Sequence, residues 1–142
     1  MHRDVSLIIF YKNDKILVQD RRNMNKWGEE YGFFGGSIEA GETPEEAVVR
    51  ETREELSFEL KEFRFFGKFR HKFRDISLTE YVFVAPCPSF SAFNQKEGQG
   101  MMLVSEEEGL KLKMPQSSEY QGEYDIMREV FEWLRAGKNK LG

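Results

Sequence analysis

The sequence is poor in cysteine, in long apolar runs and in net charge. Cys87 is the only cysteine among 142 residues, which excludes an internal disulfide framework and a cysteine-cluster zinc site. No apolar run is long enough to cross a bilayer. The short run from Leu7 to Tyr11 has no small-residue cleavage site behind it and is typical of a strand rather than a signal peptide. We therefore expect a cytoplasmic protein with no membrane partner.

The charge balance is only mildly acidic, with a formal net charge of -4. This balance gives no global reason to expect nucleic acid as a partner, although it does not exclude a local basic patch. Hydrophobic residues make up 39% and charged residues 32% of the chain, as in folded soluble proteins. Because the length suits one domain and no repeat or linker is visible, we expect residues 1–142 to form a single domain.

Short β-branched and aromatic runs predict at least five strands. The runs Val5–Tyr11 and Lys15–Gln19 flank Asn13 and Asp14, which suit a tight hairpin turn. The other expected elements are strands at 61–74, 78–85 and 101–104 and helices at 44–56 and near 118–137. This order predicts an α/β sandwich, and its sheet should be mixed because a hairpin joins the first two strands.

The segment 61–74, "KEFRFFGKFRHKFR", alternates between aromatic and basic residues. One parity carries Phe63, Phe65, Phe69 and Phe73, and the other carries Arg64, Lys68, Arg70, Lys72 and Arg74. A period of two is typical of a half-buried strand, with a bend expected at Gly67. We expect the phenylalanines to fill the core and the cations to face water; the alternative is a cationic face that contacts RNA.

A strong helix start precedes a group of acidic residues. Thr43 can cap the helix, Pro44 fits its first position and Glu46 completes a capping box. The side of this helix that should face the core consists of Val48, Val49, Thr52 and Leu56.

The C-terminal helix should also have an apolar side. It consists of Tyr120, Tyr124, Met127, Phe131 and Leu134, and Gly137 should end the helix.

Three glutamates of the first helix fall on one face. At the helical period, Glu51, Glu54 and Glu55 lie within an arc of about 100°. They offer hard oxygen ligands to one point, as Mg²⁺ or Mn²⁺ requires; a solvated acidic face is the alternative. Gly35 and Gly36 let the backbone approach a ligand closely, and their carbonyls can also bind a cation.

The spacing of these residues resembles the Nudix box, Gly-x5-Glu-x7-Arg-Glu-U-x-Glu-Glu-x-Gly-U, in which U is a bulky apolar residue. The chain supplies Gly36, Glu42 and then "RETREELSF" from Arg50 to Phe58. Thr52 stands where the family has an apolar residue, and Ser57 stands where it has glycine. The resemblance implies a Nudix-type α/β/α sandwich with a mixed central sheet. It also implies hydrolysis of a nucleoside diphosphate linked to another group, with Mg²⁺ or Mn²⁺ as cofactor.

The resemblance also implies roles for individual residues. Glu51, Glu54 and Glu55 would bind metal, with a carbonyl of Gly35 or Gly36, and one glutamate would serve as general base. Arg50 would orient the carboxylates, and Glu42 would anchor the loop to the helix. In the MutT-like branch of the family, a glutamate in a context similar to "KEGQ" supplies a further metal ligand or the base; Glu97 matches that position.

The MutT-like context favours a nucleoside triphosphate substrate, including an oxidised purine such as 8-oxo-dGTP, cleaved to monophosphate and pyrophosphate. The candidate substrate contacts are Arg21 and Arg22 for phosphate and Gln116 or Ser117 for a base edge. Phe33, Tyr81 and Trp27 are candidates for base stacking, and the alternative for each ring is a place in the hydrophobic core. The alternatives are ADP-ribose, a nucleotide sugar or a dinucleoside polyphosphate as substrate, or a non-catalytic domain that binds nucleotide or RNA. An isopentenyl diphosphate isomerase needs a reactive cysteine, for which Cys87 is a poor candidate. Many relatives are homodimers.

Overall fold

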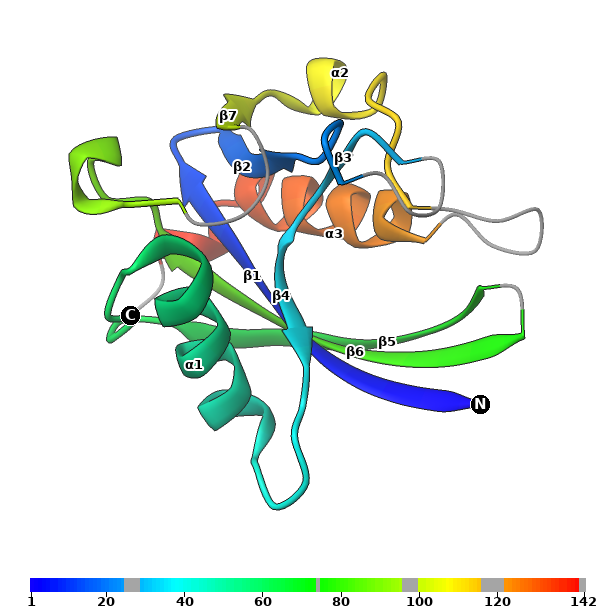
Figure 1. Cartoon of the computed structure of the whole chain (residues 1–142). Coiled ribbons are helices and arrows are strands. Elements are labelled where there is room, and N and C mark those ends of the chain that lie inside the picture. Colours follow the sequence, from blue (N-terminus) through cyan, green and yellow to red (C-terminus); the bar gives the residue numbers. More distant parts are fainter. Residues whose placement is uncertain (25–28, 74, 96–99, 116–121, 141–142) are drawn as a thin grey trace.

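The computed structural model describes residues 1–24, 29–73, 75–95, 100–115 and 122–140. It contains a central sheet with helices on both sides (Figure 1). The strands are β1 (His2–Lys12), β2 (Lys15–Asp20), β3 (Tyr31–Gly32), β4 (Phe34–Ser37), β5 (Arg64–Phe73), β6 (Ile76–Pro86) and β7 (Gly100–Val104). The helices are α1 (Pro44–Leu56), α2 (Glu106–Gly109) and α3 (Glu123–Arg135), with short 3₁₀ turns η1 (Phe90–Ala92) and η2 (Lys138–Lys140).

Strand β1 is the centre of the sheet. Along one edge it pairs in parallel with β6, and along the other it pairs antiparallel with β2 and β4. Strand β7 adds antiparallel to β2, and β5 adds antiparallel to β6. Asn13 takes the positive φ of 57° that the β1–β2 turn requires. The predicted mixed sheet and its hairpin are therefore confirmed.

Two hydrophobic layers form because successive side chains of a strand point to opposite faces. Leu7 and Ile9 of β1 pack in the same cluster as Met127 of α3. Ile8 and Phe10 pack instead with Val48 and Leu56, both on α1. The sheet is thus covered by α1 on one face and by α3 on the other, which gives the expected α/β/α sandwich.

The helix predictions hold closely. Helix α1 spans Pro44–Leu56, and its Thr43–Glu46 capping box is present. In α3, the predicted residues Tyr124, Met127 and Phe131 are buried; Tyr120 lies outside the described residues. Among the residues that the structure describes, no helix is both long enough and apolar enough to cross a membrane.

The prediction for strand β5 is wrong at Phe65, whose side chain is 53% exposed. A register shift between Phe65 and Gly67 interrupts the pairing with β6, so an additional residue enters the strand there. Before the shift, Phe65 contacts Phe83 on the α1 side of the sheet. After it, Phe69 packs on the α3 side. Because the shift reverses the alternation, the phenylalanines of this strand lie on both faces of the sheet and not on one.

Candidate functional site

Arg50 of α1 is the centre of an ion-pair network that joins the helix to the preceding loop. Its Nε lies 2.7 Å from Oε2 of Glu42, and its Nη1 lies 3.0 Å from Oε1 of Glu51 and 3.2 Å from Oε2 of Glu54. Its Nη2 also donates to the carbonyl oxygen of Ser37, at 3.0 Å. These hydrogen bonds to carboxylates raise the pKa of Arg50, and hydrogen bonding to Arg50 lowers the pKa of Glu42. The guanidinium therefore holds two glutamates of the predicted cluster in place.

The third glutamate is held by the backbone of β4. The amide N–H of Gly35 donates to Oε1 of Glu55 at 2.9 Å, and Glu55 is buried. The next residue, Gly36, lies against Glu51: a Cβ added at Gly36 would lie 2.6 Å from the Glu51 carboxyl carbon. The glycine pair thus lets the strand pass directly over two carboxylates of α1.

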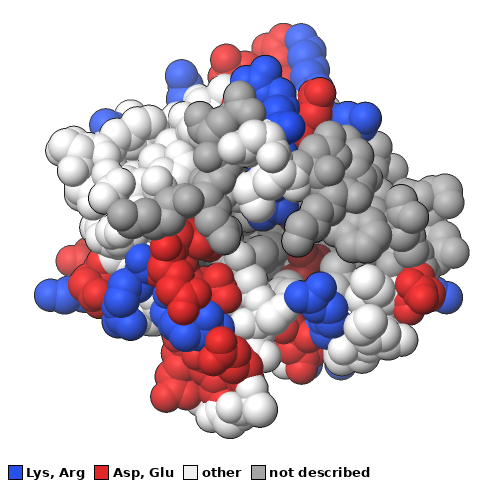
Figure 2. All heavy atoms as spheres, viewed as in Figure 1, with Lys and Arg blue, Asp and Glu red and all other residues white. Residues whose placement is uncertain are grey.

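The donor set fits a hard divalent cation. Carboxylates and backbone carbonyls are the ligands that Mg²⁺ and Mn²⁺ prefer. Glu51, Glu54 and Glu55 all extend from one helix, and Glu55 and Glu51 lie against Gly35 and Gly36. Within the described part of the chain, no three acidic, histidine or cysteine side chains are already gathered around one point. The carboxylates are held instead by Arg50 and by the Gly35 N–H. In Figure 2, acidic side chains gather over α1 and the loop before it, with basic side chains between them.

A cleft of about 230 Å³ lies on the α3 side of the sheet, and it shares Gly35 and Gly36 with the glutamate cluster. Strands β1, β4 and β6 form its floor, to which Val5, Leu7 and Leu78 contribute apolar surface. Gly35 and Gly36 form part of its wall. Strand β4 therefore separates a molecule bound in the cleft from the carboxylates of α1. A mostly apolar cleft with a few polar groups is the usual form of a small-molecule site.

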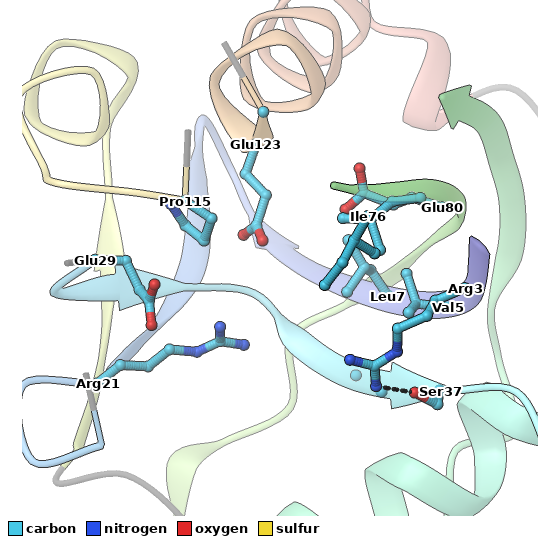
Figure 3. Close-up of a pocket in the computed structure, with 14 residues that line it drawn as sticks. Arg3, Val5, Leu7, Arg21, Glu29, Ser37, Ile76, Glu80, Pro115 and Glu123 are labelled. Carbon is cyan, nitrogen blue, oxygen red and sulfur yellow. Dashed lines mark hydrogen bonds between the residues drawn. The ribbon is translucent and has the colours of Figure 1, made fainter. Parts of the chain in front are cut away.

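Three acidic residues line the same cleft from three different segments (Figure 3). Glu29 precedes β3, Glu80 lies on β6 and Glu123 begins α3, and these residues are 4%, 4% and 6% exposed. Oε1 of Glu123 accepts a hydrogen bond of 3.0 Å from the amide N–H of Phe33. Arg21 donates to the carbonyl oxygen of Phe33 at 2.6 Å and brings one cation to this group of acids.

Burial changes the titration of these groups. It raises the pKa of Glu80 to about 8, and the neighbouring Glu123 contributes to the shift. Burial also raises the pKa of Glu123, while Arg21 and the Phe33 N–H oppose that shift. Burial lowers the pKa of His71, which lies beside Glu80. Burial therefore favours the protonated carboxyl groups of Glu80 and Glu123 and the neutral imidazole of His71.

The predicted substrate contacts are divided between the cleft and other places. Arg21 lines the cleft. Arg22 is instead exposed and ion-paired with Asp20 at 2.6 Å, with its guanidinium over the ring of Tyr31. Tyr81 packs on the α1 side of the sheet beneath Lys68. Trp27, Glu97, Gln116 and Ser117 lie outside the described residues.

The prediction that the Phe33 ring stacks on a base is wrong. The ring is 0% exposed and belongs to the core cluster under α3. Phe33 contributes to the cleft through its backbone, whose N–H and carbonyl hold Glu123 and Arg21. Hydrophobic character alone did not distinguish a core ring from a stacking platform.

Sequence reasoning missed four charged residues of the cleft, namely Arg3, Glu29, Glu80 and Glu123. One signal was available for Glu80, because it is the only charged residue in the otherwise apolar strand "LTEYVFVA". A charged side chain in a strand that is covered on both faces destabilises the fold unless it is compensated, so Glu80 could have been singled out. Glu29 and Glu123 gave no such signal, since they lie among other polar residues.

Comparisons with known proteins agree with this architecture. The model of the NUDIX domain family matches residues 1–134. The 8-oxo-dGTP diphosphatase of Escherichia coli (strain K12) is 39% identical over 72 residues, a match that covers 51% of this chain and 56% of that protein. The chain thus matches only about half the length of this relative.

Solved structures show the same fold. The solution structure of the E. coli ORF135 protein superposes with a TM-score of 0.74 at 23% identity, covering 96% of this chain and 92% of that one. The MutT NUDIX hydrolase from Burkholderia pseudomallei gives a TM-score of 0.69 at 20% identity, covering 91% and 97%. At these identities the structural likeness speaks for the fold alone, whereas the family match extends over most of the sequence. The chain belongs to the NUDIX domain family.

Proposed function

We propose that the protein is a Mg²⁺- or Mn²⁺-dependent pyrophosphohydrolase that cleaves a nucleoside triphosphate to a monophosphate and pyrophosphate. In this proposal, residues 1–142 act as a single NUDIX domain. The observation that carries it is the position of Gly35 and Gly36, which contact the glutamates of α1 on one side and line the cleft on the other. In this proposal, Gly35 and Gly36 of β4 thus belong both to the cation site and to the small-molecule site.

Each residue of the α1 network has a task in this reaction. Glu51, Glu54 and Glu55 would hold the metal, with a backbone carbonyl of Gly35 or Gly36, and one of these carboxylates would accept the proton of the attacking water. The bound cation would neutralise the phosphate oxygens and lower the pKa of bound water. The remaining positioning is done by the chain itself, through Arg50 and through the Gly35 N–H.

The cleft would hold the nucleoside end of the substrate. Its apolar floor suits a base and a sugar. Arg21 also lines the cleft, and its guanidinium would contact the phosphates of the substrate. Because the E. coli relative is an 8-oxo-dGTP diphosphatase, we take 8-oxo-dGTP as the first substrate to test. Such an enzyme would act on the cytoplasmic nucleotide pool. Whether the protein forms a homodimer would be determined separately by light scattering.

The decisive experiment is Glu54→Gln in a nucleotide hydrolysis assay with Mg²⁺ or Mn²⁺. The Glu54 side chain is 58% exposed, so the fold should survive and hydrolysis should be lost. Glu45→Gln is the matched control, because Glu45 is an exposed glutamate in the first turn of the same helix; it should retain activity. The panel should include 8-oxo-dGTP, ordinary dNTPs, ADP-ribose, dinucleoside polyphosphates and nucleotide sugars, with products identified by mass. Unchanged turnover in Glu54→Gln would contradict the proposal.

A non-catalytic domain that binds RNA is the competing function. Lys68, Arg70 and Lys72 are exposed on β5 and would provide its contacts. Salt-dependent RNA binding together with no metal-dependent turnover of any nucleotide would favour it instead. The presence of every box carboxylate, Glu42, Glu51, Glu54 and Glu55, supports the hydrolase.

A further inference from the structure

The cations of β5 form a regular pattern with the hydroxyl groups of β6. Three cross-strand pairs each place a cation beside a hydroxyl-bearing residue: Lys68 and Tyr81, Arg70 and Thr79, Lys72 and Ser77. The three pairs follow one another at every second residue, so they all lie on the same side of the sheet. Tyr81 packs on the α1 side, which places the whole set there. We call these six residues the cationic face.

Helix α1 leaves the cationic face open. The helix meets β1 at Ser6, whose hydroxyl donates to the carbonyl oxygen of Pro44 at 2.8 Å. Beyond this contact, the N-terminal part of β1 and the adjoining parts of β5 and β6 extend away from α1 (Figure 1). A hollow of about 430 Å³ lies over these strands, and His2 and Asp4 of β1 line it together with residues of the cationic face. The cleft with its buried acids lies on the other side of the sheet.

The cations of the hollow are available to a ligand. Lys68 and Arg70 are exposed, and neither forms an ion pair with a carboxylate in the part of the chain that the structure describes. Asp4 brings an acid to the hollow, but its Oδ1 lies 2.8 Å from Nε2 of His2. The hollow therefore has an excess of positive charge, although the chain as a whole has a net charge of -4. A local field of this sign attracts an anionic partner.

The composition of the surface favours a row of phosphates as that partner. Apart from the half-buried ring of Tyr81, no apolar side chain belongs to the cationic face, whereas protein interfaces and membrane-binding surfaces depend on an apolar centre. Interfaces with nucleic acids are more polar and much more positively charged. Three cations at every second residue also extend over about 14 Å of strand, which is longer than one phosphate or pyrophosphate group requires.

We propose that the cationic face binds the phosphate backbone of a single-stranded nucleic acid, in addition to the hydrolysis assigned to the α1 glutamates. The hollow is three strands wide, or about 10 Å. A flexible single strand can lie in it, whereas a duplex is stiff over this length and would contact only its rims. Lys68, Arg70 and Lys72 contact successive phosphates, and the bases remain in solvent. Binding is therefore independent of sequence and strongly dependent on salt.

The test measures binding of a labelled ten-nucleotide oligothymidylate by fluorescence anisotropy without divalent metal, so that hydrolysis plays no part. Three phosphate contacts predict a slope of about -2 when the logarithm of the association constant is plotted against that of the salt concentration. This slope corresponds to about 20-fold weaker binding at about 200 mM than at about 50 mM salt. Lys68→Gln combined with Arg70→Gln removes two of the contacts and should reduce the slope to about -0.7.

A matched double variant controls for net charge. Lys111→Gln combined with Lys138→Gln removes two exposed cations outside the cationic face and should keep the wild-type slope. The double variant of β5 should hydrolyse nucleotides as wild type does, and Glu54→Gln should bind the oligothymidylate as wild type does. Loss of hydrolysis alone would therefore count against the proposed function and not against this inference.

Three results would overturn the inference. The first is that wild-type protein does not bind the oligothymidylate at about 50 mM salt. The second is that the folded Lys68→Gln, Arg70→Gln variant keeps the wild-type affinity and slope. The third is that a duplex of the same length, or a polyglutamate peptide, binds as tightly as the single strand, because the surface would then attract any anion.

Discussion

Replacing Gly36 by alanine adds a single methyl group at the point where β4 passes over α1. The new Cβ would lie 2.6 Å from both Cδ and Oε1 of Glu51, and 2.7 Å from its Oε2. Non-bonded heavy atoms settle at about 3.5 Å or more. The Glu51 carboxylate must therefore retreat by about 1 Å, while the backbone carbonyl of residue 36 stays in place.

A displacement of that size should reduce turnover strongly and stability only slightly. Misplacing a reacting group by about 1 Å can cost about 100-fold in rate. Glu51 would also lose its 3.0 Å contact with Arg50, a partly exposed ion pair whose loss costs about 1 kcal/mol or less. Alanine partly offsets this cost, because it restricts the unfolded chain more than glycine does. We expect kcat to fall about 100-fold, with a higher half-saturating concentration of Mn²⁺ and a nearly unchanged melting temperature.

The assay compares three glycine variants by metal-dependent hydrolysis and thermal unfolding. Gly35→Ala should unfold the protein, because its Cβ would collide with the Ser6 carbonyl of β1 and its φ is 147°. Gly100→Ala should change nothing, since no described atom lies within 4 Å of its added Cβ. If Gly36→Ala folds and keeps activity within about threefold of wild type, then the position of Glu51 does not matter to the reaction and the reasoning is refuted.

Four further changes test other parts of the structure. Thr52→Val should raise the free energy of unfolding in urea by about 1 kcal/mol, because the fully buried Thr52 hydroxyl has no hydrogen-bond partner among the described residues; an unchanged midpoint would contradict this. Ser57→Gly should add about 0.5–1 kcal/mol by the same measurement, since Ser57 ends α1 in the left-handed region at φ 52°. Arg50→Lys keeps a charge but loses the planar fork, and steady-state kinetics should show a kcat about 10- to 100-fold lower; full activity would mean that the carboxylates need no orientation. For Glu80, the unfolded carboxyl ionises above its ordinary pKa near 4.5 while the buried one keeps its proton up to about 8. Stability should therefore fall as pH rises through this window, and Glu80→Gln should flatten the fall in urea titrations between about pH 5 and pH 8.5.

The parts of the fold that could be predicted are those that local sequence determines. The boundaries of α1 follow from its cap at Thr43 and its proline at position 44, and the hairpin follows from Asn13. The grouping of Glu51, Glu54 and Glu55 follows from the helical period. In each case a short stretch of chain carries its own structural reason.

The parts that could not be predicted depend on contacts between distant segments. Glu29, Glu80 and Glu123 come together only because the sheet and α3 bring three separate segments to one cleft. Phe33 looked suitable for stacking because its burial depends on which layer covers β4. The exposure of Phe65 depends on a register shift against β6, and no periodicity within residues 61–74 reveals it.

That register shift also decides which side chains the second half of β5 presents to each layer. If the strand ran without it, every residue from Lys68 onward would turn to the opposite side of the sheet. Lys68 and Arg70, which now pair across from Tyr81 and Thr79, would point toward α3, and His71 would leave Glu80. One additional residue near Phe66 thus sorts an entire strand, keeping its cations away from the cleft and an imidazole behind the cleft's buried acid. Deleting Phe66 would remove the additional residue itself, so the pairing of Gly67 with Val82 and of Lys68 with Tyr81 would continue regularly from Phe65.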